Sequence, residues 1–133
     1  MSKRWLVDGM NVIGSRPDRW WNDPDRAMHS LANALDEYSE STGEEVTVVF
    51  DRAPTTPPQT THAVVTAASR KGRNAADREI VDIVKLEGDP SSLTVVTSDR
   101  RLRDQVQALG SRTVSSGKFR DLLDARDARR TDR

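Results

Sequence analysis

Short apolar runs recur along the chain, separated by stretches with the periodicity of helices. The strongest runs are Val46–Phe50 and Leu93–Thr97, which are continuous and rich in β-branched residues, as is typical of strands buried on both faces of a sheet. Weaker or shorter runs at Trp5–Val7, Ala63–Thr66 and Arg112–Val114 predict three further strands. The pattern therefore predicts five strands, enough for one sheet.

Between these runs, apolar residues spaced three and four apart predict helices. The first helix begins with Asp23 as N-cap and Pro24 at the first helical position, and it ends before Gly43. Further helices are predicted over 75–87, from Asp99 or Arg100 to Leu109, and, as a short segment, after Gly117. Strands that alternate with helices predict an α/β fold, a three-layer α/β/α sandwich with a mainly parallel five-stranded sheet.

The length of 133 residues fits one domain. We expect this domain to cover residues 1–124 and the charged segment 125–133 to form a frayed tail. The proline-rich segment Pro54–Thr61 suits neither a helix nor a central strand, so we expect a loop beside the carboxyl end of the second strand.

Composition excludes several classes of protein. The chain has no cysteine and two histidines, so disulfide frameworks, thiolate zinc sites and cysteine nucleophiles are ruled out. No apolar run approaches the roughly 18 residues that a membrane span needs, and the N-terminus carries no signal-peptide core. We therefore expect a cytoplasmic protein without a membrane partner.

Acidic residues follow three of the predicted strands. Asp8 and Asp51 come directly after apolar runs, Asp99 follows the run Leu93–Thr97 after one serine, and Asp77 stands at the start of the second predicted helix. The carboxyl ends of parallel strands meet at one edge of the sheet, which is where ligands of such folds bind. We therefore expect these carboxylates to converge there, with Asn11 near Asp8 as a neutral oxygen ligand.

Crowded carboxylates favour a bound cation, because without one they repel each other and take up protons. Oxygen ligands without thiolate or imidazole select Mg²⁺ or Mn²⁺ over zinc, and such ions support hydrolysis of phosphodiesters. Ordinary turn, helix-cap and surface roles stay open for each acid, most of all for Asp51 and Asp104. Asp104 lies five residues after Asp99, which is about 140° around a helix.

Two groups of basic residues flank the predicted acidic edge. They are Arg70, Lys71 and Arg73 before the second helix, and Arg100, Arg101 and Arg103 beside Asp99. Solvated surface charge is the alternative for any single member, but the placement of both groups suits a phosphate backbone. We predict that single-stranded RNA is bound mainly through its backbone, with strong salt dependence.

Four blocks of the sequence resemble the NYN domain family, in particular its YacP-like branch of PIN-like nucleases. The blocks are Leu6–Gly14 (LVDGMNVIG), Val48–Asp51 (VVFD), Asn74–Asp77 (NAAD) and Val95–Arg100 (VVTSDR). The resemblance runs from about residue 4 to 123. It implies a PIN-like fold and a metal-dependent ribonuclease in which Asp8, Asp77 and Asp99 match the metal-binding acids.

The resemblance also implies supporting residues. Asn11 matches the asparagine after the first strand, Asp51 falls on the second-strand pattern, and Ser98 is the small hydroxyl residue before the third acid. Asp104 occupies the region of a further acid in related nucleases. The chain departs from the family where Ala76 precedes a single acid, since the family often has a denser acidic pair there.

The leading hypothesis is an endoribonuclease that uses Mg²⁺ or Mn²⁺, with Asn11 orienting a ligand water. Its substrate would be single-stranded or messenger RNA, and the wider family suggests the ribosome as a further partner. One alternative is a receiver-like domain phosphorylated on Asp51, with Asp8, Thr97 and Lys118 completing its site. Another is a catalytically inactive module that binds RNA or the ribosome. The oligomeric state is not predicted.

Overall fold

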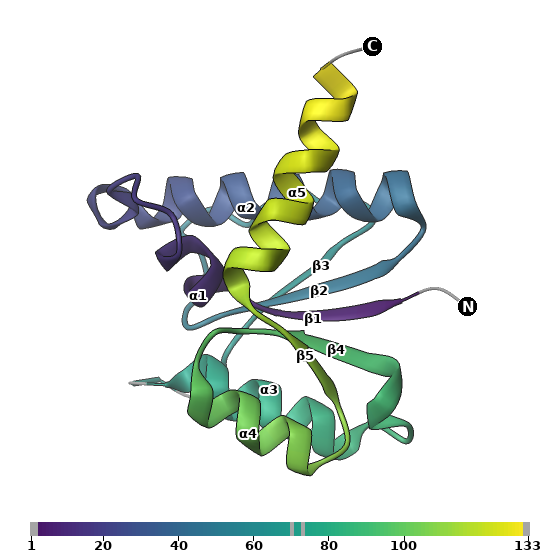
Figure 1. The fold of residues 1–133 in the computed structure, drawn as a ribbon. Helices are drawn as coiled ribbons and strands as arrows, with labels where there is room; N and C mark the ends of the chain where they lie inside the picture. Colours follow the sequence, from purple (N-terminus) through teal and green to yellow (C-terminus); the bar gives the residue numbers. More distant parts are fainter. Residues whose placement is uncertain (1–2, 70, 73, 132–133) are drawn as a thin grey trace.

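A parallel five-stranded sheet forms the centre of the protein (Figure 1). The structure is a computed structural model that describes residues 3–69, 71–72 and 74–131. Its strands are β1 (Arg4–Asp8), β2 (Glu45–Phe50), β3 (Val64–Ala67), β4 (Leu93–Val96) and β5 (Arg112–Val114). They lie in the order β3-β2-β1-β4-β5, and all four neighbouring pairs are parallel. The five predicted strands are thus confirmed, with β1 at the centre.

Helices cover both faces of the sheet (Figure 1). They are α1 (Gly9–Gly14), α2 (Pro24–Thr42), α3 (Ala75–Leu86), α4 (Arg100–Ala108) and α5 (Ser116–Thr131), with short 3₁₀ turns η1 (Trp20–Asn22) and η2 (Pro90–Ser92). The predicted signals delimit α2: the Asp23 side chain accepts from Arg26 N–H at 3.1 Å, and Gly43 ends the helix with a φ of 74°. None of the described helices is long and apolar enough to cross a membrane.

The sheet separates two hydrophobic cores. Trp5 and Val7 of β1 pack on one face, in the core that α1, α2 and α5 complete, whereas Leu6 packs on the opposite face with α3 and α4. This alternation follows from the two-residue period of a strand. It confirms the predicted three-layer α/β/α arrangement, because both faces of the central strands are covered.

Two helices differ from the prediction. Residues 9–14 had been assigned no element but form α1, a helix too short to show an apolar period. The short helix expected after Gly117 instead continues to Thr131, through part of the segment expected to fray. Arg126 stabilises this longer helix against α2, because its guanidinium donates to the carbonyl and hydroxyl oxygens of Ser41 at 3.1 and 3.2 Å. The division of the chain at residue 124 stays a prediction.

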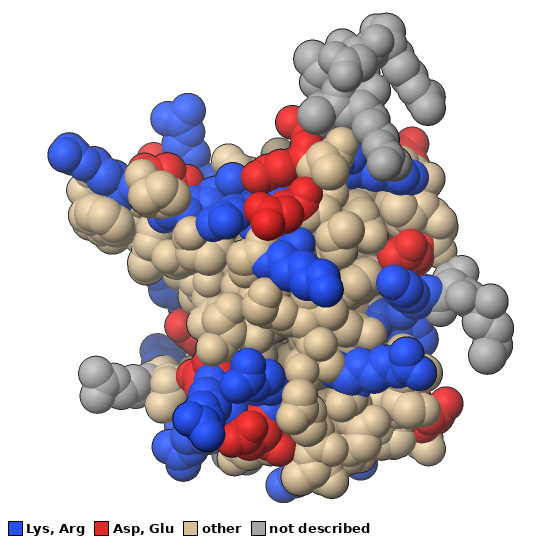
Figure 2. All heavy atoms as spheres, in the orientation of Figure 1, with Lys and Arg blue, Asp and Glu red and all other residues tan. Residues whose placement is uncertain are grey.

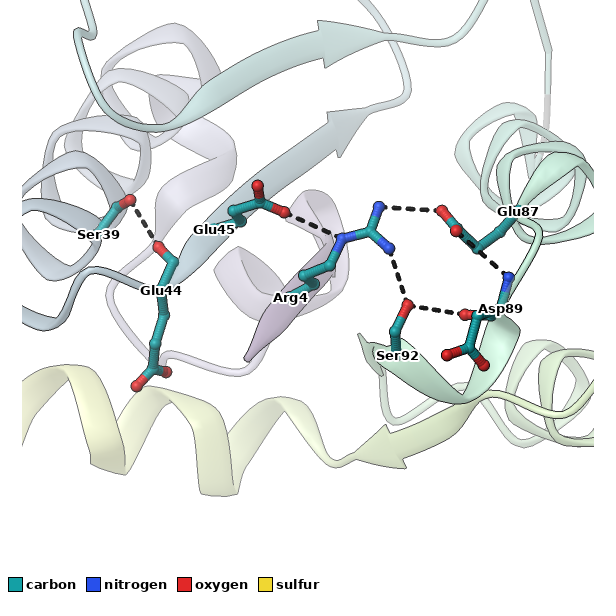
Figure 3. Close-up of polar contacts among 7 residues, drawn as sticks. All are labelled: Arg4, Ser39, Glu44, Glu45, Glu87, Asp89 and Ser92. Atoms are coloured by element: carbon teal, nitrogen blue, oxygen red, sulfur yellow. Dashed lines mark hydrogen bonds and ion pairs between the residues drawn. The ribbon is translucent and has the colours of Figure 1, made fainter. Parts of the chain in front are cut away.

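At the amino end of the strands, Arg4 joins three parts of the fold (Figure 3). Its guanidinium donates to Glu45 of β2 at 3.0 Å, to Glu87 after α3 at 2.9 Å, and to Ser92 of η2 at 2.8 Å. The hydrogen bond from Arg4 is the main reason that the pKa of Glu87 is lowered. This network holds the edge of the sheet opposite to the one where β1 ends in Asp8.

Candidate active site

At the carboxyl edge of the sheet, the strand order reverses between β1 and β4. These strands are neighbours, but the chain leads from β1 outward to β2 and β3, and from β4 outward to β5. Open parallel sheets bind their ligands where the strand order reverses in this way. Asp8 is the last residue of β1, and Asp99 follows shortly after β4 as the N-cap of α4. Two of the predicted acids therefore flank the point where the strand order reverses.

A buried threonine links these two acids. The Thr97 hydroxyl donates to Asp8 Oδ2 at 3.1 Å and accepts from the backbone N–H of Asp99, also at 3.1 Å. Asp8 and Thr97 are only 5% and 1% exposed. Asp99 Oδ1 accepts from the N–H groups of Arg101 and Leu102 at 2.9 and 3.3 Å, which caps α4. The strand end and the helix cap thus hold both carboxylates in place.

Asn11 ties three segments together behind Asp8. Its side-chain oxygen accepts from the Ser98 N–H at 2.8 Å and from the Ser116 hydroxyl, while Ser98 Oγ accepts from the Ser116 N–H at 3.0 Å. The backbone of Asn11 also hydrogen-bonds the Asp8 carboxylate. In this structure the Asn11 oxygen is engaged by protein donors, so the residue positions α1 against the loop after β4 and the start of α5.

Asp51 holds the helix that carries Asp77. Asp51 follows β2, and its Oδ1 accepts from the Ala76 N–H at 3.1 Å. The N-cap residue of α3, Asn74, has a left-handed φ of 61° and makes no side-chain cap of its own. Asp51, which lies after β2, therefore caps α3 in place of Asn74. It sets the position of the first turn of α3, where the half-buried Asp77 lies.

The four acids interact electrostatically. Burial is the main cause that raises the pKa of Asp8 to about 7, and the charges of Asp77 and Asp51 add to it. Burial also raises the pKa of Asp77, with further contributions from Asp99 and Asp51. The acids therefore lie close enough to affect one another at the carboxyl edge of the sheet.

Comparison with known proteins agrees with this geometry. Residues 5–132 match the YacP-like NYN domain family. The chain belongs to this family. It is similar to the crystal structure of Rae1 (YacP) from Bacillus subtilis, with a TM-score of 0.74 and 25% identity over 99% of this chain and 80% of that one. A point mutant of the same protein gives a TM-score of 0.73 at 25% identity, over 96% and 78% of the two chains. Comparison with curated protein sequences found no significant match.

Membership of the YacP-like NYN domain family implies a nuclease-type function related to RNA. It confirms the resemblance drawn from the sequence, and it decides against the receiver-like alternative. The Asp51 carboxylate, which would be phosphorylated in that alternative, instead caps α3, and the Thr97 hydroxyl is hydrogen-bonded to Asp8.

The donor set of this NYN domain suits a hard divalent cation. Asp8, Asp77 and Asp99 offer carboxylate oxygens, the ligands that Mg²⁺ and Mn²⁺ prefer. A cation among them would relieve the burial and repulsion that raise the pKa of Asp8 and Asp77. Among the residues that the structure describes, no three acidic or histidine side chains are already arranged around one metal position.

Basic side chains gather at the start of α4, next to acidic ones (Figure 2). Arg100 and Arg101 are exposed there and Arg103 is half-buried, while Lys71 is exposed ahead of α3. Arg101 lies close enough to lower the pKa of Asp77 against the stronger effect of burial. The predicted partners Arg70 and Arg73 fall outside the described residues, and Asp104 is exposed on α4.

Two residues of the site were not among the predicted site residues. Thr97 had been considered only for the receiver-like alternative, although its position two residues before Asp99 was a usable signal. Ser116 gave no such signal, because its contact with Asn11 joins residues that are 105 positions apart. Both are buried hydroxyls whose roles depend on tertiary contacts.

Proposed function

We propose that this YacP-like NYN domain is a metal-dependent ribonuclease that cleaves single-stranded RNA internally, in the cytoplasm. The observation that carries the proposal is that Asp8, Asp77 and Asp99 lie close together at the carboxyl edge of the sheet, where Asp8 is buried and its pKa is raised to about 7. A buried carboxylate with a raised pKa, at the point where the strand order of a parallel sheet reverses, indicates a functional site.

Asp8, Asp77 and Asp99 would hold one or two Mg²⁺ or Mn²⁺ ions. When bound, such an ion neutralises phosphate charge and makes a water molecule more acidic. The protein's own contribution is to hold the ligands still. Thr97 orients the carboxylate of Asp8, and the N–H groups at the start of α4 orient that of Asp99.

The supporting residues act around these ligands. Asn11 and Ser98 hold the loop after β4, and Asp51 fixes the first turn of α3. Asp104 lies on the exposed side of α4, and we retain it as a supporting residue.

The basic residues at the edge would bind the phosphates on either side of the scissile bond. They are Arg70, Lys71, Arg73, Arg100, Arg101 and Arg103. Messenger RNA as the natural substrate and the ribosome as a partner belong to the same proposal, with family membership as their support.

The test is cleavage of a labelled single-stranded RNA in Mn²⁺, Mg²⁺ or EDTA. The wild type is compared with Asp8→Asn and Asp99→Asn, and with Asp121→Asn as a matched control, since the Asp121 side chain on α5 is 75% exposed. We expect EDTA to stop cleavage, both site variants to lose it, and the control to keep it. Internal products from a circular RNA would show that cleavage is endonucleolytic.

A second candidate function is an RNA-binding module without turnover. The observation in its favour is that the described acids are not yet arranged around one metal position. Tight RNA binding by folded wild type, with no cleavage in either metal, would decide for this module and against the nuclease.

A further inference from the structure

A groove of about 370 Å³ separates α3 from α4 and begins at the acidic edge. Asp77 and Arg101 line it at the end that it shares with the candidate active site, and Lys85 and Gln105 line it further along the two helices. Lys85 is eight residues after Asp77, which places it about 12 Å further along α3 at 1.5 Å per residue. The groove therefore leads away from the acids along the helix layer.

Positive charges are spread along this groove. Arg78, Lys85 and Arg101 line it, with Arg78 held by a hydrogen bond to the carbonyl oxygen of Lys71 at 3.3 Å. Burial raises the pKa of Asp77, and the charges of Arg101 and Arg78 oppose that rise, so both cations lie close to this acid. An extended polyanion would meet successive cations along such a path, whereas a compact anion would meet only one end.

The other lining residues suit a nucleic acid strand. Gln105 supplies an amide that can donate and accept, as a ribose hydroxyl or a base edge requires, and Val81 adds an apolar contact. Asp82 lines the same groove and opposes an anion there. Within one groove, Lys85 and Asp82 thus have opposite expected effects on the same ligand.

We propose that the groove between α3 and α4 holds the backbone of single-stranded RNA on one side of the scissile bond, with Lys85 and Gln105 as positioning residues. This inference rests on the proposed ribonuclease function, because it names the path of the substrate away from the same site. It extends the RNA-binding surface beyond the basic residues at the edge, along the length of α3.

The test measures binding of a labelled single-stranded RNA in EDTA over a range of salt concentrations. Lys85→Gln should weaken binding about 2- to 5-fold and reduce the slope of log K against log salt by about 0.7, the value for one phosphate on a single strand. Asp82→Asn should tighten binding. Arg112→Gln is the matched control, because Arg112 is exposed at the amino end of β5, away from the groove.

A cleavage assay then assigns the groove to one side of the substrate. Lys85→Gln should raise KM for a long RNA and leave kcat unchanged, and this effect should vanish when the nucleotides on one side of the cleavage site are removed. Removal of the nucleotides on the other side should leave the effect intact.

The two proposals fail in different ways. If wild type cleaves RNA but Lys85→Gln and Asp82→Asn change neither the affinity nor the salt slope, the proposed RNA path along the groove is wrong. The proposed ribonuclease function is then still supported. If binding depends on Lys85 and Asp82 as expected but no metal supports cleavage, the groove binds RNA, but the nuclease function and the place of the groove beside a scissile bond are wrong.

Discussion

The Thr97 hydroxyl donates to the buried carboxylate of Asp8 at 3.1 Å and, at the same distance, accepts from the N–H of Asp99. One side chain thus sets the position of two candidate metal ligands that come from different strands. Burial raises the pKa of Asp8 to about 7, and the hydrogen bond from Thr97 opposes this rise.

Replacement of Thr97 by valine should shift the pH dependence of cleavage. Thr97→Val keeps the branched shape but removes the donor, so the pKa of Asp8 should rise further. A net hydrogen bond of roughly 1 kcal/mol corresponds to somewhat less than one pH unit. We expect the rising limb of the rate–pH profile to move to higher pH by about that amount, while Thr97→Ser stays close to wild type. Superimposable profiles for Thr97→Val and wild type would contradict this role.

Asp8→Asn should stabilise the metal-free protein at alkaline pH. The pKa of Asp8 is about 7 in the folded protein, against an ordinary value of 3.8. At pH values between these two pKa values, the Asp8 carboxyl group has lost its proton in the unfolded chain but keeps it in the folded protein. The free energy of unfolding therefore falls as the pH rises. The accumulated loss reaches at most about 4 kcal/mol above pH 7, and asparagine avoids it.

Thermal unfolding in EDTA at about pH 4 and pH 8 measures this effect. The melting temperature of Asp8→Asn should exceed that of wild type at the higher pH and lie close to it at the lower one. Asp121→Asn is the control for loss of an exposed carboxylate. An equal difference from wild type at both pH values would show that Asp8 is ionised without penalty.

Local signals explain why much of the fold was predictable. Asp23, Pro24 and Gly43 delimit α2 through capping and backbone preferences that act within one turn. The meeting of Asp8 and Asp99 follows from a general property of parallel sheets. Both inferences needed only nearby residues and the order of the strands.

The parts that were not predicted depend on contacts between distant segments. The cap of α3 comes from Asp51, which accepts a hydrogen bond from the N–H of Ala76, 25 positions later in the chain. The hydrogen bond between Asn11 and Ser116 spans 105 positions. Neither residue type is unusual for its local sequence, so only the folded arrangement shows the role.

Gly9→Ala should strongly destabilise the protein. A Cβ atom at Gly9 would lie 2.5 Å from ring carbons of Phe50, which is fully buried. Overpacking of this kind typically costs about 1–3 kcal/mol. Gly14→Ala in the same helix is the control, since its Cβ would meet no atom within 4 Å. We expect urea unfolding to show a large loss for the first variant and none for the second.

The contact with Phe50 can be tested separately. In a Phe50→Leu background, the further cost of Gly9→Ala should be smaller than in wild type, because leucine lacks the ring carbons that clash. An unchanged cost would place the strain elsewhere in α1.

Arg4→Met should lower stability and leave catalysis unchanged. Arg4 bonds to Glu45 and Glu87 at the amino edge of the sheet, and both pairs are partly exposed, so we expect a loss of about 1 kcal/mol. High salt should reduce the difference from wild type in urea unfolding. A lower kcat at a temperature where the variant is folded would contradict the separation of this network from the active site.

The capping of α3 by Asp51 has a consequence for how this protein family can vary. Asp51, which directly follows β2, holds the first turn of the helix, so the position of Asp77 is set from β2 as well as from the loop that joins β3 to α3, where Ser69 and Lys71 bond to Glu79 and Arg78. The first turn of α3 thus has an anchor beside the sheet that substitutions in the loop do not remove. Side chains of the loop can therefore vary while the contact from Asp51 continues to hold the turn that carries Asp77.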